Sequence, residues 1–244
     1  MGELIAVVSG KGGTGKTTVC AGISSALAMQ GQKILAIDCD IGLRNLDIAL
    51  GIPDLSALSF TEITQESYSL DQATEHPVYP NLRFLTAPVN DTAGQVDTES
   101  FCELLQQART QFDYILLDAP AGVEDGFSLA AQFADRIILV TGQDPAAIRD
   151  ACRAGQLLTQ MGKENVRLVV NRVNKKMIAA TGMNIDDIMD KAGLPLLGVI
   201  PEDSNVILAS SFRQPLLGYT KGGAAAACRR IARRVRGLSV PVKI

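Results

Sequence analysis

Residues 9–18 read SGKGGTGKTT, and this stretch carries the residue types that hold phosphate groups. Residues 10–17 satisfy the pattern G-x-x-x-x-G-K-[ST], in which glycines let backbone amides turn toward phosphates. Lys16 can then reach the β and γ oxygens, and the Thr17 hydroxyl can ligate Mg²⁺. Lys11 has no role in that general pattern and needs an explanation of its own. The predicted phosphate-binding residues are Gly10, Lys11, Gly12, Gly13, Thr14, Gly15, Lys16, Thr17 and Thr18.

A nucleotide site also needs acids that hold magnesium and water, and three aspartates are candidates. Asp38 ends the apolar run KILAID, Asp40 lies two residues later, and Asp118 ends the run DYILLD. Because the carboxyl ends of parallel strands meet at one edge of a sheet, these side chains should lie near the phosphate loop. Without a nearby histidine base, an acid such as Asp40 would orient the attacking water, which predicts a slow ATP hydrolase.

Short apolar runs that alternate with helix-like windows must position these residues. The windows fall near residues 15–30, 99–111, 125–134, 146–162, 184–193, 202–211 and 222–236, and the runs are LIAVV (4–8), KILAID (33–38), LRFLTA (82–87), DYILLD (113–118), RIILVT (136–141), RLVVN (167–171) and LLGVI (196–200). Nearly continuous apolar runs are typical of strands buried on both faces. We therefore predict an α/β three-layer sandwich with a mostly parallel sheet of about seven to eight strands. Residues 52–81 are expected to hold a helix and a loop.

Composition narrows the class of protein. The chain has 244 residues with a net charge of −3, and its hydrophobic and charged fractions, 47% and 20%, are ordinary for a globular protein. The five cysteines form no CxxC pair, which favours buried thiols over a zinc site or a disulfide framework. The only histidine, His76, has no ligand partner at a suitable spacing and is expected on the surface. A strand that follows directly on Met1-Gly2-Glu3, with no long apolar segment, predicts a cytoplasmic protein.

The motifs resemble the ParA/MinD class of P-loop ATPases, whose deviant phosphate loop KGGxGK[ST] contains an extra lysine at the place of Lys11. The likeness extends over nearly the whole chain, through IDCDIGLRNLD (37–47), LLDAPAGVEDG (116–126) and GVIPEDSNVILAS (198–210). Residues 43–47 and 120–124 are closer to the MinD branch, which regulates cell division, than to plasmid-partition relatives.

The resemblance implies a role for Lys11, because subunits of this class sandwich two ATP molecules and the signature lysine reaches the phosphates of the opposite subunit. It implies a homodimer when ATP is bound, with Lys11, Lys16 and Asp40 as catalytic residues. Thr17 would hold Mg²⁺ directly, and Asp38 and Asp118 would hold it through water. The resemblance also places Asn171, Arg172, Pro201 and Glu202 at the adenine, with Asp203 in the same loop, and Asp150 at the dimer or partner surface. Protein regulators of division, an activator and an inhibitor, are the expected partners.

The C-terminal segment departs from the MinD pattern, which usually ends in a short amphipathic helix beyond the folded domain. Residues 219–244 contain seven Lys or Arg and no acid, and five of these are arginines between Arg229 and Arg236. Ile231, Val235 and Leu238 share one helical face. The segment fits a core helix with arginines in water, a contact with anionic membrane, or a contact with DNA phosphates.

The sequence therefore predicts one ATPase domain, residues 1–237, and a short tail, residues 238–244. The expected function is a dimerising ATPase switch in septum placement, located in the cytoplasm and in peripheral contact with the inner face of the cell membrane. A DNA- or cargo-partitioning ATPase that uses the arginine-rich helix is the main alternative. Lys11 argues against a P-loop kinase, and the missing cysteine pair argues against an iron–sulfur carrier. A regulatory nucleotide binder that scarcely hydrolyses ATP remains open.

Overall fold

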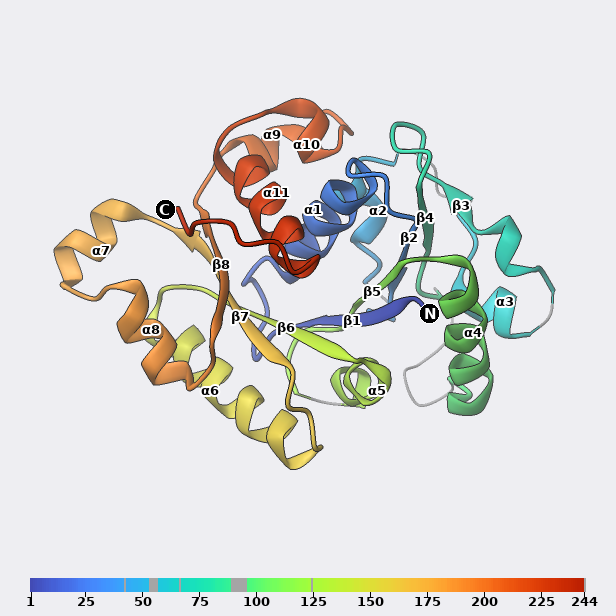
Figure 1. Ribbon diagram of the computed structural model, residues 1–244, viewed down its shortest axis with the longest axis horizontal. Helices are drawn as coiled ribbons and strands as arrows, with labels where there is room; N and C mark the ends of the chain where they lie inside the picture. The colour runs from blue at the N-terminus through green and yellow to red at the C-terminus, as the bar shows by residue number, and fades with distance from the viewer. Residues whose placement is uncertain (42, 53–56, 66, 89–95, 124, 244) are drawn as a thin grey trace.

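The computed structural model describes residues 1–41, 43–52, 57–65, 67–88, 96–123 and 125–243. Within these residues one sheet of eight strands runs through the molecule, with helices on both sides (Figure 1). In spatial order the strands are β3 (Thr74–Glu75), β4 (Leu82–Leu85), β2 (Ile34–Asp38), β5 (Tyr114–Asp118), β1 (Glu3–Val8), β6 (Arg136–Thr141), β7 (Val166–Val173) and β8 (Leu196–Pro201). All neighbours are parallel except β3, which runs antiparallel to β4. The predicted α/β sandwich is confirmed.

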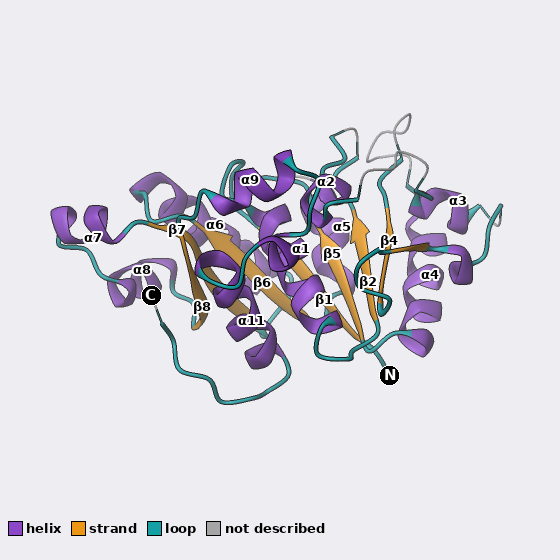
Figure 2. Cartoon of the chain, turned by 90° about the horizontal axis from the view of Figure 1, so that it is seen from above, coloured by secondary structure: helices purple, strands orange, loops and turns teal. Residues whose placement is uncertain are grey.

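Two helical layers cover the sheet. One layer contains α1 (Lys16–Ala28), α2 (Leu46–Leu50), α9 (Asn205–Ser211), α10 (Leu216–Tyr219) and α11 (Gly223–Val235). The other contains α3 (Phe60–Thr64), α4 (Thr98–Gln111), α5 (Asp125–Phe133), α6 (Pro145–Gln160) and α8 (Ile185–Ala192). Figure 1 shows α9, α10 and α11 on one side of the sheet and α5, α6 and α8 on the other, and Figure 2 looks onto the α1–α11 side from above. A short 3₁₀ turn, Leu70–Gln72, precedes β3.

Strand β1 shows why the apolar runs are continuous. Its residues alternate between the two cores: Leu4, Ala6 and Val8 pack on the α4–α5 side, and Ile5 and Val7 pack on the α1–α11 side. Since side chains of a strand point alternately to opposite faces, both faces must be apolar when both are covered.

Several short elements differ from the sequence prediction. Helices α2, α10 and α7 (Lys175–Thr181) and the two-residue strand β3 were not predicted as separate elements. They are short, and α7 buries none of its residues, so no apolar periodicity marks it. The predicted helix at 202–211 begins at Asn205 instead. Residues 52–81 hold α3, the 3₁₀ turn and β3, while residues 53–56 and 66 lie outside the described part of the chain.

His76 was predicted at the surface, and this is wrong: only 2% of the residue is exposed. Its Nε2 donates to the carbonyl of Leu50 at 2.9 Å, and its Nδ1 accepts from the backbone N–H groups of Val78 and Tyr79 at 3.0 and 3.2 Å. A neutral imidazole with both nitrogens bonded can be buried without an unsatisfied polar group.

The cysteine prediction is partly wrong. All five thiols are free, and Cys20, Cys39 and Cys228 are buried as expected. Cys102 and Cys152, however, are partly exposed on α4 and α6. They lie on helices whose outer faces meet solvent, which a search for cysteine spacing does not detect.

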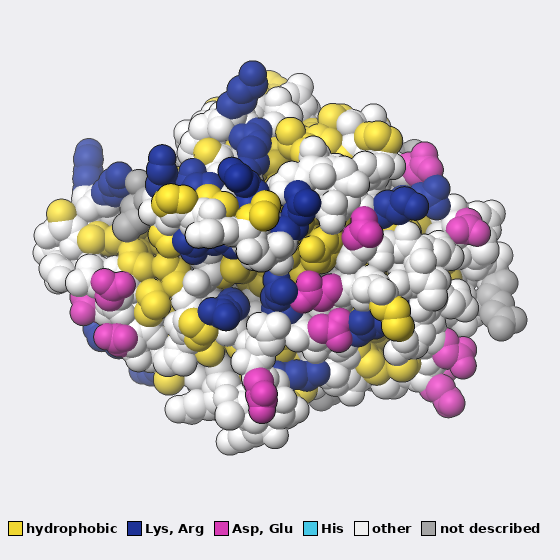
Figure 3. Space-filling view, in the orientation of Figure 1, with side chains coloured by type: hydrophobic (Ala, Val, Ile, Leu, Met, Phe, Trp, Pro, Cys, Tyr) yellow, Lys and Arg dark blue, Asp and Glu magenta, His cyan; other side chains and the backbone are white. Residues whose placement is uncertain are grey.

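The C-terminal helix α11 is a core helix, with Ile231 and Val235 buried and Leu238 exposed. Most of its arginines are not simply solvated, because they donate to backbone carbonyls. Arg234 binds the carbonyls of Leu197 in β8 and Val240 in the tail, each at 2.8 Å, and thereby fastens the tail to the edge of the sheet. Figure 3 shows Lys and Arg side chains across the middle of this face, where Figure 1 places α11. Within the described residues, no helix is both long and apolar enough to cross a membrane.

Candidate functional site

The phosphate loop lies between β1 and α1, at the carboxyl edge of the sheet. Gly13 and Gly15 have φ angles of 80° and 83°, a left-handed conformation that glycine adopts without strain. Gly10 lies against α6, since a Cβ there would be 2.3 Å from the carbonyl oxygen of Asp150. The loop is therefore seated directly on the backbone of α6.

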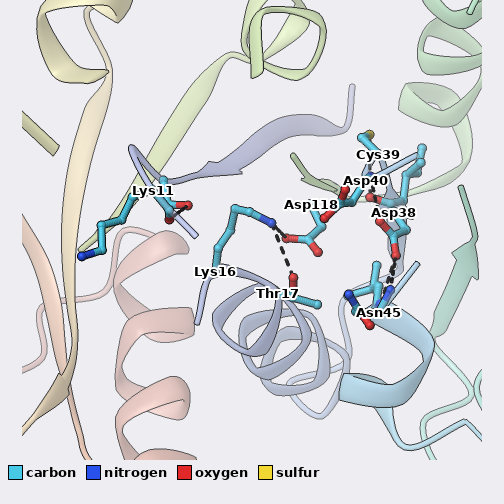
Figure 4. Close-up of polar contacts among 11 residues, drawn as sticks. Lys11, Lys16, Thr17, Asp38, Cys39, Asp40, Asn45 and Asp118 are labelled. Atoms are coloured by element: carbon cyan, nitrogen blue, oxygen red, sulfur yellow. Dashed lines mark hydrogen bonds and ion pairs between the residues drawn. The ribbon is translucent and has the colours of Figure 1, made fainter. Parts of the chain in front are cut away.

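Lys16 lies inside the loop and forms a buried ion pair with Asp118 at the end of β5. The distance from Lys16 Nζ to Asp118 Oδ1 is 2.9 Å, and the two side chains are 6% and 1% exposed. Lys16 Nζ also donates to the Thr17 hydroxyl at 3.4 Å (Figure 4). Burial raises the pKa of Asp118, and the charge of Lys16 opposes this increase. The two charges hold each other in a site shielded from water.

Asp38, at the end of β2, connects the site to α2. Its Oδ2 accepts from the backbone N–H groups of Asn45 and Leu46, both at 3.0 Å, and its Oδ1 accepts from Asp40 N at 2.9 Å. Burial and the neighbouring charge of Asp118 raise the pKa of Asp38 to about 6, although these hydrogen bonds act to lower it. Asp40 is half-buried beside it, and burial raises its pKa as well. The three predicted aspartates thus end up at one edge of the sheet.

The donor set of this edge fits Mg²⁺, which prefers oxygen ligands. Asp118 Oδ2 is buried and has no hydrogen-bond partner among the described residues. The Thr17 hydroxyl and the carboxylate of Asp38 supply further oxygens. No group of three or more His, Cys, Asp or Glu side chains is arranged to hold a metal ion anywhere in the described part. A magnesium ion here would therefore depend on the Thr17 hydroxyl and on nucleotide phosphates as well as on the two aspartates.

A cavity of about 430 Å³ opens beside the phosphate loop. The predicted adenine residues Asn171, Arg172, Pro201 and Glu202 all line it. Its other lining residues, which the sequence analysis did not single out, come mainly from α1, α9 and α11: Val19, Ile200, Ser204, Val206, Ile207, Leu216, Ala224 and Cys228. Only the three-dimensional fold brings these mostly apolar side chains together. The cavity has a size and an apolar lining that suit a purine base.

Asn171 links this cavity to the phosphate loop. Its Nδ2 donates to the carbonyl of Thr14 at 2.8 Å, and a Cβ on Gly15 would lie 2.4 Å from the same nitrogen. Since a backbone carbonyl only accepts, the amide is held with its nitrogen toward the loop. Arg172, with φ of 55°, donates to the carbonyl of Gly13 at 3.3 Å and lies 3.7 Å from Glu202. Such a backbone conformation is uncommon for arginine and is typical of functional sites.

Lys11 lies apart from the other site residues. Its side chain points away from Lys16 (Figure 4), and its Nζ is 3.4 Å from Asp144 Oδ1. Asp144 caps α6 by accepting from Ala147 N at 2.9 Å. Asp144 was not predicted as a site residue, although an aspartate directly before a proline commonly starts a helix. The structure does not bring Lys11 to the phosphate site of its own chain.

The remaining predicted site residues lie around the same edge. Thr18 lines the cavity, Gly12 lies in the loop, and Asp150 is half-buried on α6 with its backbone against Gly10. Gly42 and Glu124, which belong to two of the quoted motifs, lie outside the described residues.

The fold and the site together define a P-loop nucleotide-binding protein with a second lysine in its loop. The profile of the CobQ/CobB/MinD/ParA nucleotide binding domain matches residues 5–216. The septum site-determining protein MinD of Bacillus subtilis is 38% identical over 251 aligned residues, which cover 100% of this chain and 92% of that protein. The MinD protein of Synechocystis is 36% identical, with coverage of 99% and 92%.

Solved structures of MinD proteins are also similar to this chain. MinD in the MinC:MinD complex of Aquifex aeolicus has a TM-score of 0.91 and 34% identity, with 99% of this chain and 98% of that chain covered. MinD of Pyrococcus horikoshii, complexed with Mg-ADP, has a TM-score of 0.84 and 29% identity, with 96% of each chain covered. The chain belongs to the MinD proteins of the CobQ/CobB/MinD/ParA family, and it is an ATPase.

Proposed function

We propose that the chain is an ATP-driven switch that pairs with a second copy of itself when ATP is bound and that acts in placing the division septum. Family membership supports the role in septum placement. The observation that carries the dimer is the separation of the two loop lysines. Lys16 is buried in its own site, whereas Lys11 is partly exposed and points out of it. A cation placed this way can complete the site of a facing subunit, as an arginine finger does.

Binding begins with an exchange of partners at Lys16. The triphosphate would occupy the amides of the phosphate loop, and Lys16 would move from Asp118 to the β and γ oxygens. This leaves both oxygens of Asp118 available at the site where Thr17 and Asp38 also present oxygen donors. Bound Mg²⁺, held by Thr17 directly and by Asp38 and Asp118 through water, would offset the charge of the phosphates.

Asp40 is the proposed residue that orients the attacking water. It is half-buried, its backbone is tied to Asp38, and its charge interacts with that of Lys16. Lys11 of the second subunit would stabilise the charge that develops on the transferred phosphoryl group. Loss of that group after hydrolysis would remove the ligand that both subunits share, so the pair would separate.

The cavity beside the loop is the proposed adenine site. With the Nδ2 of Asn171 engaged by Thr14, its Oδ1 remains as an acceptor for the exocyclic amine of adenine. Arg172, Pro201 and Glu202 would enclose the base. An acceptor at this place disfavours guanine, which carries a carbonyl at the corresponding position.

Protein regulators are a further part of the proposal. The related Aquifex protein is solved in a MinC:MinD complex, which supports a comparable partner for this chain. Asp150 is the proposed contact, since it lies on α6 beside the phosphate loop and is partly exposed. Binding of a partner at Asp150 would therefore act directly on the phosphate loop, because Gly10 packs against the Asp150 backbone.

The proposed location is the cytoplasm, with peripheral contact to anionic membrane through the arginines of α11. Cosedimentation with anionic liposomes, with ATP and with ADP, tests the membrane contact beside a salt-matched DNA pull-down. ATP-dependent recovery with lipid supports membrane contact, whereas recovery with DNA alone favours the partitioning alternative. Recovery with neither would mean that a protein partner determines the location.

The central experiment measures phosphate release and sedimentation of the protein with Mg²⁺ and ATP, for the parent and two variants. Lys16→Ala should lose nucleotide binding, because the loop loses its main phosphate cation. Asp40→Ala should bind ATP and form dimers but stop turnover. A parent that stays monomeric with ATP, or an Asp40→Ala variant that releases phosphate at the parent rate, would contradict the proposal.

A further inference from the structure

We propose that Asp144 is the resting partner of Lys11: it holds the ammonium group away from the phosphate site in the unpaired subunit, and this hold limits pairing of two subunits. The inference rests on the proposed function, in which Lys11 acts across the dimer. It adds a positioning residue that the motifs of the phosphate loop do not include.

The first support is the placement of Asp144. Asp144 caps α6, and its Oδ1 accepts a hydrogen bond from the N–H of Ala147. Pro145 follows at the first position of the helix. The same oxygen lies 3.4 Å from Lys11 Nζ. Hydrogen bonding to Ala147 and the charge of Lys11 lower the pKa of Asp144, so the carboxylate is ionised at neutral pH. The negative charge is therefore in place before Lys11 arrives.

The second support is the contact between the phosphate loop and α6. Gly10 packs so closely on the Asp150–Ala151 backbone that even one Cβ would clash. Lys11 follows Gly10 directly, so its backbone is held at a fixed distance from the start of α6. The ion pair across 133 residues of sequence is thus built into the fold and does not depend on the flexibility of a loop.

The third support comes from comparing the two lysines. Lys16 also rests on a carboxylate, but that pair is buried, whereas 39% of the Lys11 side chain and 56% of the Asp144 side chain are exposed. An exposed ion pair is weak enough to be exchanged for a phosphate group. In a two-fold dimer both subunits must make this exchange, so the effect of the pair on association is counted twice.

The test is the dissociation constant for self-association with Mg²⁺ and a non-hydrolysable ATP analogue, measured by sedimentation velocity. Asp144→Asn removes the charge but retains an oxygen that can cap α6. We expect it to tighten association about three- to tenfold, from the range of exposed ion pairs broken twice per dimer. The protein concentration needed for half-maximal ATP turnover should fall by the same factor, while the plateau rate per dimer stays unchanged.

Two controls separate a charge effect from a structural one. Glu164→Gln, at an exposed position beyond the far end of α6, removes the same charge and should leave association at the parent value. High salt screens exposed charges, so the parent and Asp144→Asn should converge as salt is raised. In a Lys11→Gln background, Asp144→Asn should have no further effect.

The outcomes distinguish a failure of this inference from a failure of the proposed ATP-dependent dimerisation. If the parent does not associate with the ATP analogue, the proposed function fails. If the parent associates and Asp144→Asn associates equally or more weakly, Asp144 does not restrain Lys11 and the inference is overturned. Equal tightening by Glu164→Gln, or in the Lys11→Gln background, would show an effect of net charge and would also overturn it.

Discussion

At the scale of single residues, the site depends on side chains whose orientation is fixed by a second contact. Asn171 is the clearest case, because its Nδ2 is held by the carbonyl of Thr14, which fixes the orientation of the amide. Asp38 is similar, with three backbone N–H groups on its two oxygens. Such fixed groups need no reorganisation when substrate binds.

Base selectivity is the prediction that follows from Asn171. The parent should prefer ATP to GTP by about tenfold or more, since one mismatched buried hydrogen bond costs about 1–3 kcal/mol. Asn171→Ala should weaken ATP binding and reduce this preference. Competition between ATP and GTP for a fluorescent nucleotide would measure both, and an unchanged ATP/GTP ratio in Asn171→Ala would count against the role of its amide.

His76 gives a prediction about pH and stability. Burial lowers its pKa below the usual value of 6.5 in the folded protein, so the unfolded chain binds more protons as the pH falls below 6.5. The stabilising contribution of the neutral ring is therefore complete above pH 6.5 and is lost as the pH falls toward the folded pKa. Urea unfolding between pH 5 and pH 7.5 should show this loss.

His76→Gln is the matched variant for that measurement, since it cannot titrate. We expect it to be less stable than the parent by about 1–3 kcal/mol at pH 7.5, because Val78 and Tyr79 lose the acceptor of their N–H groups. Its stability should depend less on pH. If the parent and His76→Gln have the same pH dependence, another group is responsible.

At the scale of elements, the site is assembled by close contacts between helices and loops. Helix α1, which begins in the phosphate loop, packs on α11 where Gly22 meets Cys228. A Cβ on Gly22 would lie 2.6 Å from the Cys228 sulfur. The approach of these two helices also shapes the cavity, because Cys228 lines it.

Gly22→Ala should therefore destabilise the fold by about 1–3 kcal/mol, despite the higher helix propensity of alanine. The double variant Gly22→Ala/Cys228→Ala removes the sulfur that the new methyl group meets, so part of the loss should be recovered. Thermal unfolding of the parent, both single variants and the double variant measures this coupling. Strictly additive effects would mean that the contact is not the cause.

How far the sequence could predict these elements depends on where their partners lie. The strands and long helices follow from apolar runs, and Asp38, Asp40 and Asp118 follow from strand ends that meet at one edge. The burial of His76 could not be predicted, since its hydrogen-bond partner, the carbonyl of Leu50, lies 26 residues earlier in the sequence. The Lys11–Asp144 pair spans 133 residues, and no local pattern marks it.

At the scale of the whole molecule, the tail is held to the edge of the sheet by α11. Arg234 joins β8 and the tail through Leu197 and Val240, and Arg230 donates to the carbonyl of Lys243 at 3.3 Å. Strand β8 is an edge strand, and edge strands are open to pairing with other chains unless they are covered.

Arg234→Met should release the tail while retaining most of the apolar stem of the side chain. We expect faster hydrogen exchange at residues 238–243 and a loss of about 1–2 kcal/mol in unfolding free energy from the lost hydrogen bonds. Arg233→Met is the control, since Arg233 lies on the same helix and is exposed. Equal exchange rates in both variants would show that the tail does not depend on Arg234.

The buried ion pair between Lys16 and Asp118 competes with any ligand that binds Lys16. In the exchange proposed for Lys16, a nucleotide replaces the Asp118 carboxylate with its own phosphate oxygens, and adenosine or AMP has none at the β and γ positions. The protein should therefore discriminate nucleotides by their number of phosphates, and ATP should bind more tightly than AMP although both carry the same base.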